Sequence, residues 1–271
     1  MSNHDGEAFF LPLGDGRFAA TEHTRGPWSD QHQHGGPPAA LLAHGMEALL
    51  PAGVQLARVT FELPRPVPIA DLELRAQVLR AGRAVTTLSA TLSTVADGTE
   101  VMRASALAMR TLDPALELPL PPGAAPPTAP RPPGQLAPYV LPFFTAPIGY
   151  HTAMELRFAA GRFGQGPTQA WMRMRVALIA GSAPTPLQRV LCAADSGNGV
   201  SLVLDVRRFT FVNPDLTVAL WRLPVGEWIC LDARTSVGGH GVGLADTLLW
   251  DEQGPIGRGA QTLLVAARQG P

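Results

Sequence analysis

The same order of predicted elements, an apolar helix followed by a run of short strands, occurs twice along this sequence. In the first half a loop running into a helix is predicted within 31–50, and in the second half a helix is predicted over 186–195. A repeated supersecondary unit predicts an internal duplication of one fold. Alternation and turn residues predict the strands, which lie at 9–13, 17–21, 59–63, 72–79, 85–93 and 101–109, and then at 154–158, 170–178, 208–212, 217–222, 228–236, 242–250 and 259–266.

The first of these helices is apolar on most of its sides, a pattern typical of a helix that is wrapped by other elements. Pro37 or Pro38 suits its first turn, where a missing N–H has no helical partner to lose. Gly35 and Gly36 just before it lack a Cβ atom, so a ligand or another backbone can come close. Pro51 ends the segment.

Between the two halves lies a stretch that can form neither a helix nor a central strand. Prolines occur throughout 113–138, which therefore predicts an extended linker, either packed along the surface or mobile. The expected organisation is a first domain over 1–112, the linker over 113–138 and a second domain over 139–271.

Composition excludes several classes of protein. Of 271 residues, 46% are hydrophobic and 16% charged, which favours a substantial core, and the net charge is −1 without a basic block, which argues against nucleic-acid binding. No apolar run approaches the ~18 residues of a membrane span, and the polar start of the chain is unlike a signal peptide. We therefore expect a cytoplasmic protein without membrane contact, with Cys192 and Cys230 as buried thiols.

Short motifs in both halves resemble the double hot-dog acyl-CoA thioesterases, the thioesterase II group and its shorter relatives. They are Gly35-Gly36 before the first helix, the strand start Phe61-Glu62-Leu63-Pro64-Arg65-Pro66, and Gly226-Glu227-Trp228 in the second half. The resemblance implies an α+β tandem (double) hot-dog, with two helices each wrapped by an antiparallel sheet. It also implies an acyl-CoA substrate, no cofactor, and a homo-oligomer, because such sheets are expected to expose a broad apolar outer face.

That family activates a water with an acid, a hydroxyl and an amide. The matching positions here are Asp195 at the end of the second helix, Asn213 before a strand, and Gln261 on the last strand. Asn213 departs from the family pattern, which prefers Thr or Ser there, although an amide can still donate to and accept from a water. By the repeat, Gln261 is matched with Ser105 of the first half, and the two are expected to share a cleft.

Asp195 also stands out by its position, because the helix macrodipole disfavours an anion at a helix C-terminus. Such a carboxylate is either held by other groups or solvated by the loop 196–199 that follows it. Asp215 is the fallback acid, although Asn-Pro-Asp is typical turn chemistry and predicts a turn cap there.

Three histidines near the first helix raise the question of a metal. Neither a carboxylate nor a Cys completes a tetrahedral set with His32, His34 and His44, so no metal site is predicted. His34 can still line the substrate site with Gly35 and Gly36, whose N–H groups at the start of the helix would polarise a thioester carbonyl as an oxyanion hole.

Three functions remain open from the sequence. The first is an acyl-CoA thioester hydrolase that uses Asp195, Asn213 and Gln261. The second is a hot-dog dehydratase, ranked lower because it needs a His and an acid facing across a cleft, and no His falls at a matching place in the second half. The third is an acyl-CoA or acyl-chain binding protein that has lost the chemistry.

Overall fold

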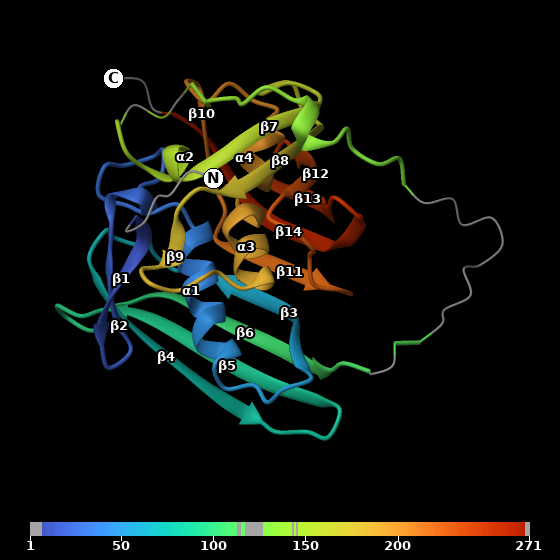
Figure 1. Ribbon diagram of the computed structural model, residues 1–271. Helices are drawn as coiled ribbons and strands as arrows, with labels where there is room; N and C mark the ends of the chain where they lie inside the picture. Colours follow the sequence, from blue (N-terminus) through green and yellow to red (C-terminus); the bar gives the residue numbers. More distant parts are fainter. Residues whose placement is uncertain (1–6, 113–114, 117–126, 143, 145, 269–271) are drawn as a thin grey trace.

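The computed structural model describes residues 7–112, 115–116, 127–142, 144 and 146–268 (Figure 1). A single sheet of 14 strands wraps two helices, α1 and α3. The elements of the first half are β1 Ala8–Gly14, β2 Arg17–Ala20, η1 Glu22–Thr24, α1 Gly36–Glu47, β3 Val54–Glu62, β4 Asp71–Arg80, β5 Val85–Thr94 and β6 Glu100–Arg110. Those of the second are η2 Pro133–Gln135, α2 Tyr150–Ala153, β7 Met154–Ala160, β8 Thr168–Met174, β9 Ala177–Ile179, α3 Pro186–Ala194, α4 Gly197–Val200, β10 Phe209–Val212, β11 Asp215–Leu220, β12 Ile229–Val237, β13 Val242–Asp251 and β14 Gly254–Ala267.

The strand order is the same in the two halves. Outward from the middle of the sheet, the first half runs β3-β6-β5-β4-β2-β1 and the second runs β11-β14-β13-β12-β8-β7. The halves meet where β3 pairs antiparallel with β11, and there Thr60 and Thr217 face each other with their hydroxyl oxygens 3.1 Å apart. This repeated order confirms the duplication that the sequence predicts.

One predicted strand is wrong. The segment 170–178 is not continuous, because β8 ends at Met174 and β9 begins at Ala177. β9 then pairs parallel with β1 of the other half, which the local sequence pattern could not show.

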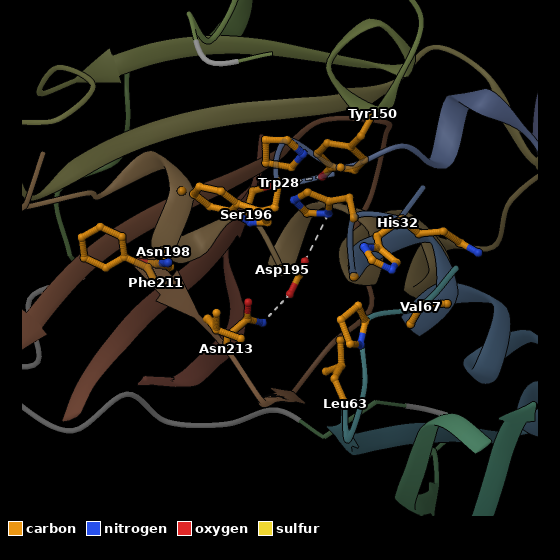
Figure 2. A pocket seen from close by; sticks show the side chains of 18 of the residues that line it. Trp28, His32, Leu63, Val67, Tyr150, Asp195, Ser196, Asn198, Phe211 and Asn213 are labelled. Atoms are coloured by element: carbon orange, nitrogen blue, oxygen red, sulfur yellow. Dashed lines mark hydrogen bonds and ion pairs between the residues drawn. The ribbon is translucent and has the colours of Figure 1, made fainter. Parts of the chain in front are cut away.

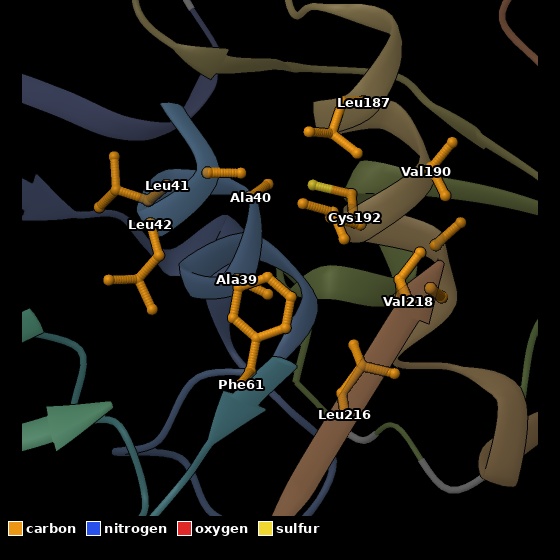
Figure 3. Close-up of a cluster of buried hydrophobic side chains, with 14 of the residues drawn as sticks. Ala39, Ala40, Leu41, Leu42, Phe61, Leu187, Val190, Cys192, Leu216 and Val218 are labelled. Atoms are coloured by element: carbon orange, nitrogen blue, oxygen red, sulfur yellow. The ribbon is translucent and has the colours of Figure 1, made fainter. Parts of the chain in front are cut away.

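The two helices pack against each other in the core with opposite directions (Figure 3). The start of α1 lies against the end of α3, because a Cβ on Gly36 would come 2.3 Å from the carbonyl oxygen of Cys192. At the other end, Glu47 of α1 contacts Thr185, the N-cap of α3, with 3.0 Å between Oε1 and Oγ1. Gly36 is therefore needed for close approach of a backbone, one of the two uses that the sequence predicts.

The ends of both helices differ slightly from the predictions. α1 stops at Glu47 with Ala48 as its C-cap, short of Leu50. α3 ends as predicted, with Asp195 as its C-cap, but the following residues 196–199 do not form a solvated loop. Gly197, Asn198 and Gly199 belong to the short helix α4, and Ser196, Gly197 and Asn198 are buried.

The described end of the linker is packed along the outer face of the second-half sheet. Trp171 donates from Nε1 to the carbonyl of Arg131 at 2.7 Å, and Arg131 donates in turn to the carbonyl of Ala159. Leu136 packs in a cluster with Trp171 and Trp250. Residues 113–114 and 117–126 of the predicted linker lie outside the described residues.

The outer face of the first-half sheet is mostly polar. On β5 and β6 it carries Thr87, Ser89, Thr91, Arg103 and Ser105. Val85, Leu107 and Met109 lie on the same face, so its polar and apolar side chains are mixed and the face does not decide whether the chain forms a homo-oligomer. Oligomerisation stays a prediction, and light scattering would check it.

Candidate active site

A cavity of about 380 Å³ lies at the end of the helix pair where α1 begins and α3 ends. Its lining comes from both halves, as the loop before α1 and the segment after β3 meet α4 and β10. Most of the wall is apolar, and among its polar groups Asn213 and His34 contact Asp195 (Figure 2). Apolar side chains that line it include Trp28, Leu63, Val67, Met172, Leu202 and Phe211.

Asp195 is buried in this wall, with 7% of its side chain exposed. Asn213 Nδ2 donates to Oδ1 at 2.8 Å, and Gln261 Nε2 donates to Oδ1 at 3.2 Å and to the main-chain oxygen of Asp195 at 3.0 Å. The end of α3 disfavours this carboxylate, but the start of α1 next to it favours an anion. The alternative of a solvated helix-terminal Asp is therefore wrong.

His34 contacts the other carboxylate oxygen, with 3.1 Å between Nδ1 and Asp195 Oδ2 (Figure 2). The same Nδ1 lies 3.1 Å from the backbone nitrogen of Gly36, whose N–H points at it. The imidazole is stacked on the ring of Tyr150, with centroids 3.7 Å apart and planes 1° from parallel. Burial lowers the pKa of His34, and the charge of Asp195 opposes this only in part.

The two glycines before α1 lie directly against these groups. A Cβ on Gly35 would come 2.8 Å from Asp195 Oδ2, so only glycine lets the carboxylate approach the start of the helix. The Gly36 N–H, predicted as an oxyanion donor, is directed to His34 in this structure.

Tyr150 is a functional candidate that the sequence did not show. It lies in the four-residue helix α2, with no motif around it. Its hydroxyl donates to the carbonyl of Cys192 at 2.6 Å and lies 2.9 Å from Ser196 Oγ. Burial raises the pKa of this phenol, so its proton stays in place to make these bonds.

The fallback acid lies away from the cavity lining. Asp215 Oδ1 accepts from the backbone N–H of Thr262 at 2.7 Å and so ties the start of β11 to β14. The predicted turn cap is wrong in detail, because this carboxylate holds a strand and not the Asn-Pro-Asp turn.

Ser105 is also wrongly placed by the sequence. Thr60 pairs with Ser105 and Thr217 pairs with Ala260, so the strand register matches Ser105 with Ala260. A shift of one residue turns a strand side chain to the other face, which is why Ser105 is exposed while Gln261 is buried.

The other histidines do not converge. His32 lines the cavity, whereas His44 packs edge-on against Phe18 with centroids 6.2 Å apart. Among the described residues no group of three His, Cys, Asp or Glu side chains could hold a metal ion. Cys192 and Cys230 are buried free thiols, as predicted. None of the described helices is both long and apolar enough to span a bilayer.

Solved structures share this fold over nearly the whole chain. A protein from Thermobifida fusca YX, described as a candidate thioesterase II, is 21% identical, with 95% of each chain covered and a TM-score of 0.72. A protein of unknown function with a hot dog fold from Alicyclobacillus acidocaldarius is 18% identical, with 96% of each chain covered and a TM-score of 0.71. An acyl-CoA thioesterase II from Mycobacterium marinum is 14% identical, with 97% of this chain and 96% of the other covered and a TM-score of 0.65. These likenesses show the class of the fold, which is the hot-dog class.

Sequence models of families go one step further. A model of the acyl-CoA thioesterase N-terminal domain matches residues 24–109, and one of the acyl-CoA thioesterase C-terminal domain matches residues 121–265. The chain therefore belongs to the acyl-CoA thioesterase family, whose members are thioester hydrolases. A search of curated proteins finds no match.

Proposed function

We propose that this protein hydrolyses an acyl-CoA thioester to the free acid and CoA at the cavity beside Asp195. The proposal follows from the family and from a cavity that combines apolar walls with one cluster of polar groups. We further propose that the two halves, 1–112 and 139–271, are two hot-dog units of a double hot-dog joined by the linker 113–138. The identical strand order in the halves supports this division.

In the proposed reaction, Asp195, Asn213 and Gln261 hold and activate the attacking water. The observation that carries the proposal is their convergence, since one amide from the turn between β10 and β11 and one from β14 donate to the same buried carboxylate. Both amides fix the carboxylate without neutralising it, because each retains an acceptor oxygen and supplies no charge. Asn213 thus serves in place of the hydroxyl that the family pattern prefers.

Backbone N–H groups of Gly35 and Gly36 are proposed to bind the thioester oxygen as it becomes negative. They lie at the start of α1, where the macrodipole favours an anion, and the Gly36 N–H would have to turn from His34 Nδ1 to the substrate oxygen. The acyl group would lie against the apolar wall formed by residues such as Leu63, Met172 and Phe211.

The test is a thiol-release assay with DTNB over a series of acyl-CoA chain lengths. Hydrolysis that depends on Asp195 supports the proposal. Binding of acyl-CoA without release of free thiol would instead favour a non-catalytic binding protein.

One observation favours a second candidate, a dehydratase or hydratase acting on acyl thioesters. That reaction needs a His and an acid facing each other, and the structure brings His34 of the first half to within 3.1 Å of Asp195 of the second. The sequence ranked this function lower because no His falls at a matching place in the second half, and in the structure the His comes from the first half instead. The family match still favours hydrolysis. Incubation with a 2-enoyl-CoA separates the two, because a hydratase forms 3-hydroxyacyl-CoA without releasing thiol.

A further inference from the structure

Three side-chain amides of the described residues line the cavity, and they differ in what they bind. Gln33 donates from Nε2 to the carbonyl of Pro68 at 2.7 Å, and Asn213 donates from Nδ2 to Asp195 at 2.8 Å. Asn198 is 6% exposed, and within the part of the chain that the structure describes neither its Oδ1 nor its Nδ2 has a hydrogen-bond partner. Of the three amides, that of Asn198 is therefore the one whose bonds are left to make.

An unpaired amide is costly in this part of the wall. A buried polar group that has given up water without gaining a partner destabilises the fold, and the large majority of such groups are paired. The surroundings of Asn198 are apolar, since Val200 of the same short helix and Leu202 and Phe211 line the cavity with it. An apolar side chain would fit there without this cost. We therefore expect the partner of the amide to be a molecule that enters the cavity.

The backbone of Asn198 is fixed, whereas its amide is free to choose its orientation. The Asn198 N–H donates to Gln261 Oε1 at 3.0 Å, which ties α4 to β14. Protein atoms close off Oδ1 but not Nδ2. Since neither atom is bonded, a half-turn of the amide exchanges the two without breaking a hydrogen bond. Asn198 can thus offer either a donor or an acceptor to a bound molecule.

The position of Asn198 indicates which part of a substrate it meets. One side chain joins it to Asp195, because Gln261 accepts from the Asn198 N–H and donates from Nε2 to the main-chain oxygen of Asp195 at 3.0 Å. Asn198 therefore lies near the reacting end of the cavity. Figure 2 shows Asn198 and Phe211 on one side of Asp195 and His32 on the other. On the side of Phe211 the amide faces the region proposed for the acyl group, next to the thioester.

We propose that Asn198 binds an oxygen of the acyl group, so that the preferred substrates carry a hydroxyl or keto oxygen close to the thioester, as 3-hydroxyacyl-CoA does. This inference rests on the proposed hydrolase function and names its substrate class. A hydroxyl both donates and accepts, so it pairs with the amide in either orientation, and a keto oxygen accepts from Nδ2. An unsubstituted chain leaves the amide unpaired, and a site built to bind an oxygen discriminates against a substrate without one.

The test compares thiol release from 3-hydroxyacyl-CoA with release from unsubstituted acyl-CoA of the same chain length. In the wild type, kcat/KM should favour the hydroxylated substrate by about 10-fold or more. Asn198→Leu keeps the approximate size and removes the amide, so it should abolish this preference. A hydroxyl at the far end of the same chain should give no preference, because it cannot reach Asn198. Gln188→Ala removes a buried amide at the other end of the helix pair and is the matched control, which should leave the ratio unchanged.

Binding keeps the proposal testable in the absence of hydrolysis. Calorimetry with Asp195→Asn should give a Kd for 3-hydroxyacyl-CoA about 10-fold below that for the unsubstituted acyl-CoA. Adding Asn198→Leu to this variant should remove the difference. A wild type that releases no thiol from any acyl-CoA would end the proposed function, and the two Kd values would still decide the role of Asn198.

A wild type that binds and hydrolyses the unsubstituted substrate as well as the hydroxylated one would overturn the proposal. So would an Asn198→Leu variant that loses the same factor on both substrates, because the amide would then serve the thioester carbonyl that all acyl-CoA share. Thermal unfolding tests a purely structural role. Replacement of an unpaired amide by an apolar side chain should leave Tm unchanged or raise it. A lower Tm with an unchanged substrate ratio would show that Asn198 only stabilises the fold.

Discussion

The two ends of the helix pair are built alike, but only one of them resembles a catalytic site. At one end Asp195 closes α3 and faces the start of α1, and at the other Glu47 closes α1 and faces the start of α3. Each carboxylate therefore lies at the C-terminus of its own helix, which disfavours an anion, and next to the N-terminus of the other helix, which favours one. The duplication supplies the carboxylate twice, so its presence alone does not make a site.

The groups around each carboxylate differ. Glu47 accepts from Thr185 Oγ1 at 3.0 Å and from Gln188 Nε2 at 2.8 Å, and these two residues form the capping box of α3. The start of α1 has no such cap, since its N-cap is Gly35. The capping box of α3 thus joins its N-cap Thr185 to Gln188 of the same helix. In the first turn of α1, Pro37 and Pro38 have no N–H, and the Gly36 N–H donates to His34, a side chain of the cavity wall.

The strands near the two helix ends also carry different residues. Four residues before Thr60 in the first half is Leu56, and four residues before its partner Thr217 in the second half is Asn213. By the register of the last strands, Ala106 stands where Gln261 stands. Both replacements are apolar and buried, so neither strand position offers an amide to Glu47, and its amide donor, Gln188, comes from α3.

The largest expected effect separates the two carboxylates by activity. Asp195→Asn keeps the shape but removes the charge, so kcat should fall by about 10²–10⁴ with little change in KM. Glu47→Gln is the matched change at the other end and should leave kcat within about twofold. Steady-state thiol release measures both, and equal losses for the two variants would abolish the distinction between the ends.

Gln261→Ala should have an intermediate effect. The side chain orients Asp195 and accepts from the backbone N–H of Asn198 at 3.0 Å, so its loss should lower kcat by about 10–10²-fold and also loosen α4. Gln188→Ala is its counterpart at the Glu47 end. That variant should lower the free energy of unfolding by about 1 kcal/mol and leave kcat unchanged. A larger loss of kcat for Gln188→Ala than for Gln261→Ala would contradict the comparison.

Local signals made the fold largely predictable, since alternation, turn glycines and the proline-rich stretch act within a few residues. The predicted match between Ser105 of β6 and Gln261 of β14 was off by one residue, because the register of a strand depends on its partner strand, which the local sequence pattern does not identify. The interruption between β8 and β9 was also not predictable from the local pattern, because β9 pairs with β1 of the other half.

The site residues were predictable from the sequence only where a short motif resembled the thioesterase II family. Asp195, Asn213 and Gln261 converge in the structure as that resemblance implies. The contact between His34 and Asp195 joins opposite halves of the chain, and no spacing in the sequence encodes it. Tyr150 lacked any signal, because a single tyrosine after a linker looks like ordinary core.

A smaller effect concerns stability at the Glu47 end. Burial raises the pKa of Glu47, although its hydrogen bonds to Gln188 and Thr185 oppose the shift. A carboxyl group whose pKa is higher in the folded than in the unfolded state stabilises the fold when it is protonated. This stabilisation is complete below the unfolded-state pKa and is lost as the pH rises through the folded-state pKa. Glu47→Gln does not titrate, so it should match wild type near pH 4 and exceed it near pH 7 by on the order of 0.5 kcal/mol. Urea unfolding at the two pH values checks this, and a variant that is less stable at pH 7 would reverse the sign.

A small effect on activity is expected at Asp215, the remaining acid near the joint of the halves. Its carboxylate accepts from the Thr262 N–H at 2.7 Å and does not line the cavity, so it stabilises the pairing of β11 with β14. Asp215→Asn keeps an acceptor oxygen and should cost about 1 kcal/mol of unfolding free energy or less, with kcat within about threefold of wild type. Thr262 donates to this bond from its backbone, so Thr262→Ala should leave the bond intact and serves as the control.

If Asp215→Asn abolishes hydrolysis while Asp195→Asn retains it, the acid has been assigned to the wrong carboxylate and the comparison of helix ends loses its functional meaning. If neither variant changes a measurable activity, activation of water by a carboxylate fails as a mechanism for this cavity.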